Sequence, residues 1–383
     1  MGHPLEEHHA AVGATMRSEG EQLVPARYGE LAAEYAALIN RVGVVDLSAH
    51  GRFAVGGKDR TTFLNGWVSQ HVKPLIPGTG VAALFLTAQG KVIADVTLDC
   101  LTDEFWLTTD AAAAAAVQKK LAPLARAGDF RLADLRAAYA AIGLVGPEAA
   151  RVIEQLTGAK PDAWRTTLTV EKVGGGVEEL PVFAHERLCL GDTAALVARR
   201  PRYGLPAFEL FVPSETAVVV WKTLTAAGAT PVGWDALDVC RIERGVGRFG
   251  CDFDDTTLAP EAGLGHAISY TKGCYVGQET VAKIHWRGHD QTARRLVSLA
   301  LDGDDFDGRP VPARGTPVLA DGKEAGLIAS AIRHPVTGAA IALGYVRSTA
   351  LANGLPLTVA GRPARVRETS ARNQGRNQEG DNP

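Results

Sequence analysis

Residues 51–135 alternate short apolar runs with amphipathic ones, which predicts strands and helices in turn. The apolar runs predict strands at 51–55, 82–87, 92–98 and 130–135. A helix carrying Phe63 and Leu64 is expected after the first strand, and an Ala-rich helix after a candidate N-cap at Asp110. The resulting order, βαββαβ, predicts a ferredoxin-like sheet with its helices on one face.

The same strand-turn-helix start recurs about 90 residues further along the chain. Residues 140–145 lead through Gly146 and Pro147 into a helix carrying Val152, and proline is well tolerated at a first helical position. Further strands are predicted at 181–184, 194–199 and 207–212, and further helices at 214–228 and 235–245. Ser214 is a candidate cap for the first of these helices. The repeat predicts a second α/β unit.

From residue 294 the pattern changes to short β-rich runs separated by Gly, Pro and Asp turns. The runs lie at 295–301, 316–319, 325–330, 340–345 and 355–359. This pattern predicts a small all-β barrel or sandwich. Glycine-rich residues 173–177 are expected to form a flexible loop, and the polar residues from 367 onward a disordered tail.

Composition excludes several classes of protein. With 40 basic and 43 acidic residues among 383, no broad charge bias indicates direct binding to nucleic acid. Five scattered cysteines without a C-x-x-C pair argue against a disulfide framework and a zinc site, so we expect reduced thiols and a cytoplasmic protein. No apolar run is long enough to span a membrane. Residues 1–25 lack the apolar core of a secretory signal and are expected to be flexible, and their histidines are not expected to form a purposeful metal site.

Candidate chemistry is concentrated in residues 272–279, Lys-Gly-Cys-Tyr-Val-Gly-Gln-Glu, which place one thiol between two glycines. Gly273 and Gly277 allow positive φ or close approach of a ligand. Lys272 and a helix start at Gln278 are expected to favour the thiolate of Cys274, which should then be accessible and more reactive than the other cysteines. The alternative is a tight turn in which a small buried cysteine fills a gap.

This octapeptide resembles the K-G-C-[YF]-x-G-Q-E signature of the YgfZ family. These are folate-binding proteins related to the T-protein of the glycine cleavage system and linked to iron–sulfur cluster maintenance. Weaker likeness extends from about residue 40 to 365, through segments 41–48, 51–59, 87–90, 234–243 and 260–264. The resemblance implies an α+β protein with a T-protein-like three-domain ring around a folate-sized cavity.

In that arrangement two ferredoxin-like α/β units precede a small C-terminal β-barrel. The expected domains are residues 26–50 with 138–290, which bind folate, then 51–137 and the barrel at 291–366. Residues 1–25 and 367–383 flank them.

The resemblance also implies contacts to tetrahydrofolate. These are assigned to Glu209, Arg241, Lys272, Tyr275, Gly277, Gln278 and Glu279. Glu209 ends an apolar run and would accept hydrogen bonds from the pterin amino and ring N–H groups; the alternative is an edge-strand glutamate in solvent. Arg241 would pair with Glu209, Glu243 or the glutamyl carboxylate of folate, and the alternative is an intrahelical salt bridge.

One departure from the T-protein pattern concerns catalysis. T-proteins carry two adjacent aspartates where this chain reads Ala94-Asp95. Because aminomethyl transfer needs a carboxylate to orient and stabilise the attacking amine, the alanine predicts that transfer is absent or very slow. Asp95 either still performs this role or points from a strand into solvent.

The resulting hypothesis is a tetrahydrofolate-binding factor that supports assembly or repair of iron–sulfur clusters in client enzymes, including tRNA-modifying ones. Its chemically active residues would be Cys274 and Asp95, and its partners iron–sulfur client or assembly proteins. One thiolate cannot hold a cluster, so Cys274 would act on a shared or transferred cluster or as a redox-active thiol. The first alternative is a folate-dependent aminomethyltransferase or demethylase of the T-protein type. The second is a passive folate-binding module with a structural cysteine.

Overall fold

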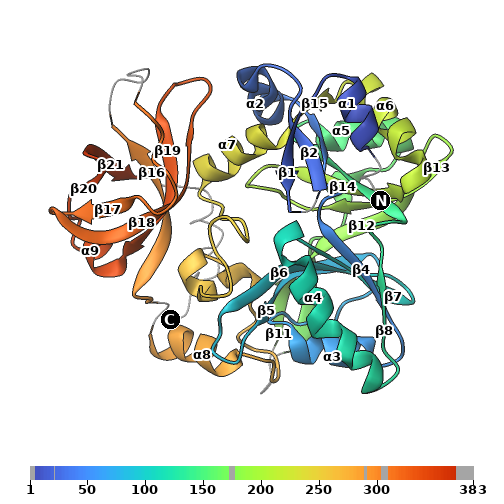
Figure 1. Cartoon of the computed structure of the whole chain (residues 1–383). Helices are drawn as coiled ribbons and strands as arrows, with labels where there is room; N and C mark the ends of the chain where they lie inside the picture. The colour runs from blue at the N-terminus through green and yellow to red at the C-terminus, as the bar shows by residue number, and fades with distance from the viewer. Residues whose placement is uncertain (1–4, 21, 172–176, 289–290, 303–308, 368–383) are drawn as a thin grey trace. The chain divides into compact units, whose positions relative to one another are not determined.

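The computed structural model describes residues 5–20, 22–171, 177–288, 291–302 and 309–367, which fall into two compact units (Figure 1). The first unit comprises Met1–Phe85, Ala94–Leu237 and Ser269–Tyr275. The second comprises Leu86–Ile93, Asp238–Ile268 and Val276–Pro383. The expected loop at 173–177 and the expected tail at 367–383 lie almost entirely outside the described residues.

The first unit is built on an 11-stranded sheet of order β15-β3-β9-β14-β13-β12-β5-β6-β7-β4-β8. One half contains β15 (Thr230–Pro231), β3 (Gly43–Asp46), β9 (Tyr139–Val145), β14 (Ala207–Pro213), β13 (Thr193–Arg199) and β12 (Phe183–Leu190). The other contains β5 (Thr79–Leu86), β6 (Val92–Cys100), β7 (Glu104–Thr109), β4 (Gly51–Gly56) and β8 (Arg131–Asp134). The halves join where Phe183 and Ala184 of β12 pair with Gly80 and Thr79 of β5. The two predicted α/β units therefore share one sheet.

The predicted order βαββαβ for residues 51–137 is wrong by one strand. β7 lies between β6 and β4 and pairs with both, so the observed order is β4-α3-β5-β6-β7-α4-β8. Its apolar core is only Phe105, Trp106 and Leu107, too short a run to stand out from the sequence pattern. Pairing on both sides stabilises this strand, and pairing is a tertiary effect.

Helices pack on both halves of this sheet. They are α2 (Leu31–Asn40), α3 (Arg60–Trp67), α4 (Ala114–Leu121), α5 (Ala149–Thr157), α6 (Ala217–Ala226) and the start of α7 (Trp234–Arg244). The predicted caps Asp110 and Ser214 make no side-chain cap, because short 3₁₀ turns at Ala111–Ala113 and Ser214–Thr216 precede α4 and α6. A small separate hairpin is formed by β10 (Thr167–Glu171) and β11 (Val177–Pro181).

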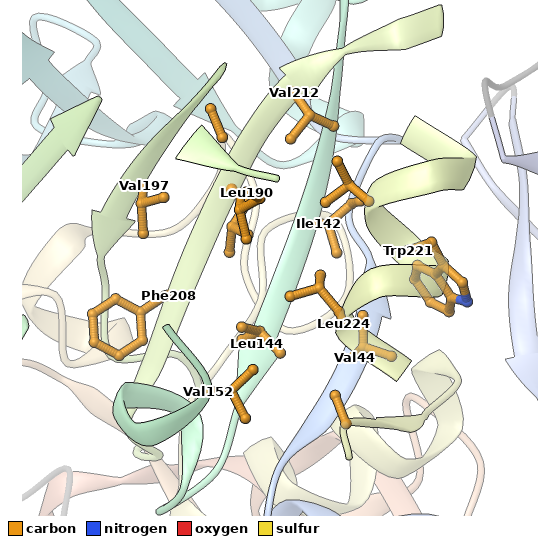
Figure 2. Close-up of a cluster of buried hydrophobic side chains, with 14 of the residues drawn as sticks. Val44, Ile142, Leu144, Val152, Leu190, Val197, Phe208, Val212, Trp221 and Leu224 are labelled. Carbon is orange, nitrogen blue, oxygen red and sulfur yellow. The ribbon is translucent and has the colours of Figure 1, made fainter. Parts of the chain in front are cut away.

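The core of this unit lies between the β3-β9-β14-β13 strands and helices α5 and α6 (Figure 2). Ile142 and Leu144 alternate along β9 with the period of two that a one-sided core requires, and both are fully buried. Trp221 and Leu224 on α6, three residues apart, present one helix face to them. Burying each such side chain contributes about 1.5–3 kcal/mol, so this layer fixes the strands beneath the site.

The described residues near the N-terminus are structured, contrary to the expectation of a flexible segment at 1–25. Residues 5–20 and 22–27 contain α1 (Glu6–Ala11) and the hairpin of β1 (Thr15–Glu19) and β2 (Gln22–Arg27). Leu5 and His9 are fully buried, and the His9 ring contacts Asp46 Oδ2 at 2.9 Å and the Tyr28 hydroxyl at 2.8 Å. Burial of a hydrogen-bonded histidine leaves no periodic signal in the sequence, so pattern reasoning missed it.

The second unit contains the predicted barrel. Its strands close in the order β16 (Arg294–Leu301), β19 (Ala340–Arg347), β18 (Lys323–Arg333), β17 (Pro317–Ala320), β20 (Leu357–Val359) and β21 (Arg362–Val366), drawn in orange and red in Figure 1. The short α9 (Ser348–Ala352) follows β19. Gln278 begins α8 (Gln278–Ala282), as predicted. Among the described residues, no helix has the length and apolarity to cross a membrane.

Candidate functional site

The hairpin formed by β13 and β14 supplies the centre of the site. Tyr203 and Gly204 at its turn both have positive φ, 51° and 73°, which is the backbone of a tight I′-type turn. The flanking residues close it through Arg202 N–H to Leu205 O and Leu205 N–H to Arg202 O, at 3.0 and 2.9 Å. This turn fixes the register that places Ala198 opposite Glu209.

Strand alternation places Arg200 and Arg202 on the face of Glu209. Directly opposed residues share a face, and so do residues two apart on one strand. The Arg200 guanidinium donates from Nη1 to Glu209 Oε2 at 2.6 Å, and Arg202 Nη2 lies 3.4 Å from the same oxygen. Glu209 is 1% exposed and lies on β14, between β13 and β9, so it is not an edge-strand glutamate in solvent.

The environment keeps the Glu209 carboxyl ionised. Burial raises its pKa, but the opposing effects of Arg200 and Arg202, with a contribution from His50, bring it down to about 2. Its second oxygen, Oε1, is buried and has no hydrogen-bond partner in the part of the chain that the structure describes. A buried ionised oxygen without a donor fits a ligand that presents N–H groups, as a pterin does.

A chain of buried polar groups continues from Arg200. Its Nη2 donates to Asp99 Oδ2, and its Nη1 also contacts Thr108 Oγ1 at 3.2 Å. The other Asp99 oxygen lies 3.6 Å from His185 Nδ1. Sequence reasoning missed Arg200, Arg202 and Asp99; the available signal was the two arginines just before the turn that leads to the strand of Glu209.

Asp95 on β6 is a second carboxyl in this region, and the residue is half-buried. Its Oδ1 is buried and has no hydrogen-bond partner among the described residues. Burial, and secondarily the charge of Asp110, raises the pKa of Asp95 to about 7. Arg202 opposes that rise, so one guanidinium acts on both Asp95 and Glu209. Ala94, beside it on the strand, is fully buried.

Lys272 is buried and contacts backbone carbonyl groups. Its ammonium donates to the carbonyl oxygens of Asn65, Val68 and Gln70 at 2.6, 2.7 and 2.9 Å. It lies 4.9 Å from the ring centroid of Tyr275, and burial, with the nearby charge of Lys73, lowers its pKa to about 7. Lys272 therefore holds the segment Ser269–Tyr275 to the end of α3 (Arg60–Trp67). The effect of its charge on the Cys274 thiol stays a prediction.

Cys274 itself is exposed, as predicted, and Cys189 is exposed too. Cys100 and Cys240 are buried, and burial raises the pKa values of their thiols to about 11 and 12. The alternative of a buried cysteine filling a gap is thus wrong for Cys274. Whether its thiol is the most reactive of the five stays a prediction.

The remaining predicted ligand residues have structural partners. Arg241 contacts Asp238 and Asp252, both at 2.5 Å, so the intrahelical salt bridge that was the alternative is present. Glu243 contacts Arg244 instead, at 3.0 Å. Both arginine contacts raise the pKa of Arg241 against the effect of burial, so its charge is already balanced.

The glycines of the octapeptide differ from each other. Gly277 has φ +86°, and an added Cβ would lie 2.5 Å from Thr87 O, so glycine is required there. Gly273 does not have positive φ, and nothing lies within 4 Å of its Cβ position. Gln278 and exposed Glu279 follow in α8.

Within the described parts of the chain, no group of three His, Cys, Asp or Glu side chains could hold a metal ion.

Comparison with known proteins matches both parts of the chain to one family. Residues 5–272 match the GCVT N-terminal domain, and residues 294–371 match the glycine cleavage T-protein C-terminal barrel domain. An aminomethyltransferase of Streptomyces coelicolor is 31% identical over 89% of this chain and 88% of its own length. One from Nostoc is 27% identical over 93% and 90%. The glycine cleavage aminomethyltransferase T of Bartonella henselae has the same fold, with a TM-score of 0.78, 21% identity and 96% of each chain covered.

Proposed function

Because the chain belongs to the glycine cleavage T-protein family, we propose that it binds tetrahydrofolate and transfers a one-carbon unit from an aminomethylated carrier to it. The observation that carries the proposal is a pair of carboxyl oxygens, Glu209 Oε1 and Asp95 Oδ1, that are buried and have no hydrogen-bond partner among the described residues. Glu209 stays ionised over the neutral range, whereas Asp95 exchanges a proton near pH 7. Such divergent pKa values separate a binding role from an acid–base role.

Glu209 would hold the pterin. Its free oxygen Oε1 accepts an N–H donor, while Arg200 keeps the other oxygen in place. When bound, tetrahydrofolate would supply the nitrogen atoms that take the one-carbon unit. Removing the acceptor loses a hydrogen bond to a charged group, worth about 1.5–3 kcal/mol.

Asp95 would move the protons. Overall, transfer breaks the carbon–sulfur and carbon–nitrogen bonds of the aminomethyl thioether and joins the methylene carbon to two folate nitrogens. Ammonia and the carrier thiol leave with the two protons that the folate N–H groups give up. A carboxyl with a pKa near 7 can both accept and donate a proton at neutral pH. This property supports transfer by Asp95 alone, although Ala94 removes the second aspartate and led to the expectation of little or no transfer.

The test measures binding and transfer separately. Glu209→Gln should weaken tetrahydrofolate binding about tenfold or more in calorimetry. Asp95→Asn should keep binding within about threefold but lower the rate of methylene-tetrahydrofolate formation by about a hundredfold or more. Unchanged folate affinity for Glu209→Gln would remove Glu209 from the site, and an unchanged rate for Asp95→Asn would remove Asp95 from the chemistry.

A second candidate function rests on the exposed thiol of Cys274 in an octapeptide of YgfZ type. It is a tetrahydrofolate-binding factor for assembly or repair of iron–sulfur clusters in client enzymes, including tRNA-modifying ones. In a strain lacking this protein, Cys274→Ser should then fail to restore iron–sulfur enzyme activity. The transfer function instead predicts that Cys274→Ser behaves as wild type, with exposed Cys189→Ser as the matched control.

A further inference from the structure

We propose that Arg200 is a positioning residue for ligand binding: held by Asp99 and Thr108, it clamps one oxygen of Glu209 and presents the other to a donor N–H. The inference rests on the proposed function only for the identity of that donor as tetrahydrofolate. Arg200 itself need not touch the ligand.

The contacts of Arg200 fix the guanidinium on two sides. Nη1 reaches Glu209 Oε2 at 2.6 Å and Thr108 Oγ1 at 3.2 Å, while Nη2 reaches Asp99 Oδ2. These partners come from three strands, β14, β7 and β6. Because the guanidinium is planar and its donors have a fixed geometry, anchoring Nη2 determines where Nη1 points.

The three charged side chains of this arrangement are buried, and burying charges costs free energy unless they are paired. The side chains of Arg200, Asp99 and Glu209 are 5%, 0% and 2% exposed. Two carboxylates share the guanidinium of Arg200, and Arg202 adds a second positive charge 3.4 Å from Glu209 Oε2. Glu209 Oε1 still has no donor among the described residues, and a ligand N–H would supply one.

Arg202 is not equivalent to Arg200. Its Nη2 lies 3.4 Å from Glu209 Oε2, and its side chain is 18% exposed. It belongs to the turn, whereas Arg200 continues the β13 ladder through its N–H bond to Ala207 O at 2.9 Å. Arg202 therefore contributes positive charge near Glu209, whereas Arg200 both contributes positive charge and fixes the orientation of the Glu209 carboxylate.

Four charged or titratable groups act on the Glu209 carboxylate: Arg200, Arg202, His50 and Arg52. Without Arg200, the Glu209 carboxylate would lose the largest of the effects that oppose its burial, although Arg202, His50 and Arg52 would remain. Protonation of Glu209 would then move up into the range where binding is measured. A residue with a merely structural role would weaken binding equally at every pH.

The experiment compares Arg200→Met with wild type in two ways. Calorimetry with tetrahydrofolate under anaerobic conditions gives the ratio of the two dissociation constants at several values from pH 5 to pH 8. We expect a ratio of about tenfold at pH 8 that grows further toward pH 5. Arg202→Met should change affinity by no more than about threefold, because its contact is longer and more exposed.

The second measurement needs no ligand. Carbon-13 NMR of glutamate-labelled protein, assigned with Glu209→Gln, should show Glu209 ionised throughout this range in wild type and titrating within it in Arg200→Met. Should Arg200→Met fail to fold, Asp99→Asn, which keeps the shape of its anchor, should shift both readouts in the same direction.

The outcomes are distinguishable. A dissociation-constant ratio that stays constant with pH, together with unchanged titration of Glu209, would overturn the role of Arg200. If wild type binds no tetrahydrofolate, the proposed function fails, and the NMR titration still decides whether Arg200 controls Glu209.

Discussion

Asp95 makes a prediction about stability that is independent of any assay of function. Burial raises its pKa from the ordinary 3.8 to about 7 in the folded protein. The folded state therefore holds a proton that the unfolded chain has lost, between about pH 4 and pH 7. The stabilisation of the folded state by protonated Asp95 is fully present below pH 3.8 and is lost progressively as the pH rises to about 7.

The magnitude follows from that interval. At 1.36 kcal/mol per pH unit, the difference from 3.8 to about 7 corresponds to at most about 4 kcal/mol. Asparagine at position 95 has nearly the same shape and cannot ionise. Asp95→Asn should therefore be more stable than wild type by about 2–4 kcal/mol at pH 8, and the gain should vanish near pH 4.

Urea unfolding followed by tryptophan fluorescence at pH 5, 6, 7 and 8 measures this difference. Asp254→Asn is the matched control in the second unit, because hydrogen bonds from Thr256 lower the pKa of Asp254. It should instead be less stable than wild type at pH 8. An Asp95→Asn protein that is no more stable than wild type at pH 8 would refute the account of Asp95 as a carboxyl whose pKa is raised by burial.

Three further substitutions test the arrangement around the octapeptide and Glu209. Lys272→Met removes the ammonium donor of three carbonyl oxygens and should lower the free energy of unfolding by at least about 3 kcal/mol. As a control, the substitution of exposed Lys73 by Met should change that free energy by less than about 0.5 kcal/mol. Equal effects of the two substitutions in urea unfolding would contradict the anchoring role of Lys272. Gly277→Ala should lower the free energy of unfolding by about 1–3 kcal/mol, because Gly277 has positive φ and its Cβ would lie close to Thr87 O. Gly273→Ala, the control, should lower it by less than about 0.5 kcal/mol. Similar melting curves for the two variants would argue against the turn at Gly277. Glu209→Gln should leave the pH dependence of the transfer rate unchanged, since that dependence belongs to Asp95; a shifted midpoint would join the two carboxyls in one titration.

The sequence was a good guide where a signal is local. Apolar runs predicted β9 and β14, and the turn-separated runs predicted an all-β barrel or sandwich, which is a closed barrel. Gln278 begins a helix as its position after Gly277 indicated. Glu209 and Asp95 were found through family resemblance, because a single acidic residue in an apolar run does not reveal its partners.

The rest depends on contacts between distant parts of the chain. Asp99 and Arg200 are separated by 101 residues, and only the sheet brings them together. Lys272 was assigned to the neighbouring thiol because its true acceptors lie more than 200 residues earlier. Likewise, the contacts of His9 with Asp46 and Tyr28 depend on tertiary packing that no local sequence pattern specifies.

The most direct test of the central claim is a single-turnover transfer assay. The full-length protein, its Asp95→Asn variant and its Cys274→Ser variant are each mixed with tetrahydrofolate and aminomethylated lipoyl carrier, and methylene-tetrahydrofolate is followed. We predict product from wild type and Cys274→Ser at equal rates that depend on pH with a midpoint near 7, and at least about a hundredfold less from Asp95→Asn. No product from wild type, or a loss confined to Cys274→Ser, would contradict the proposed function.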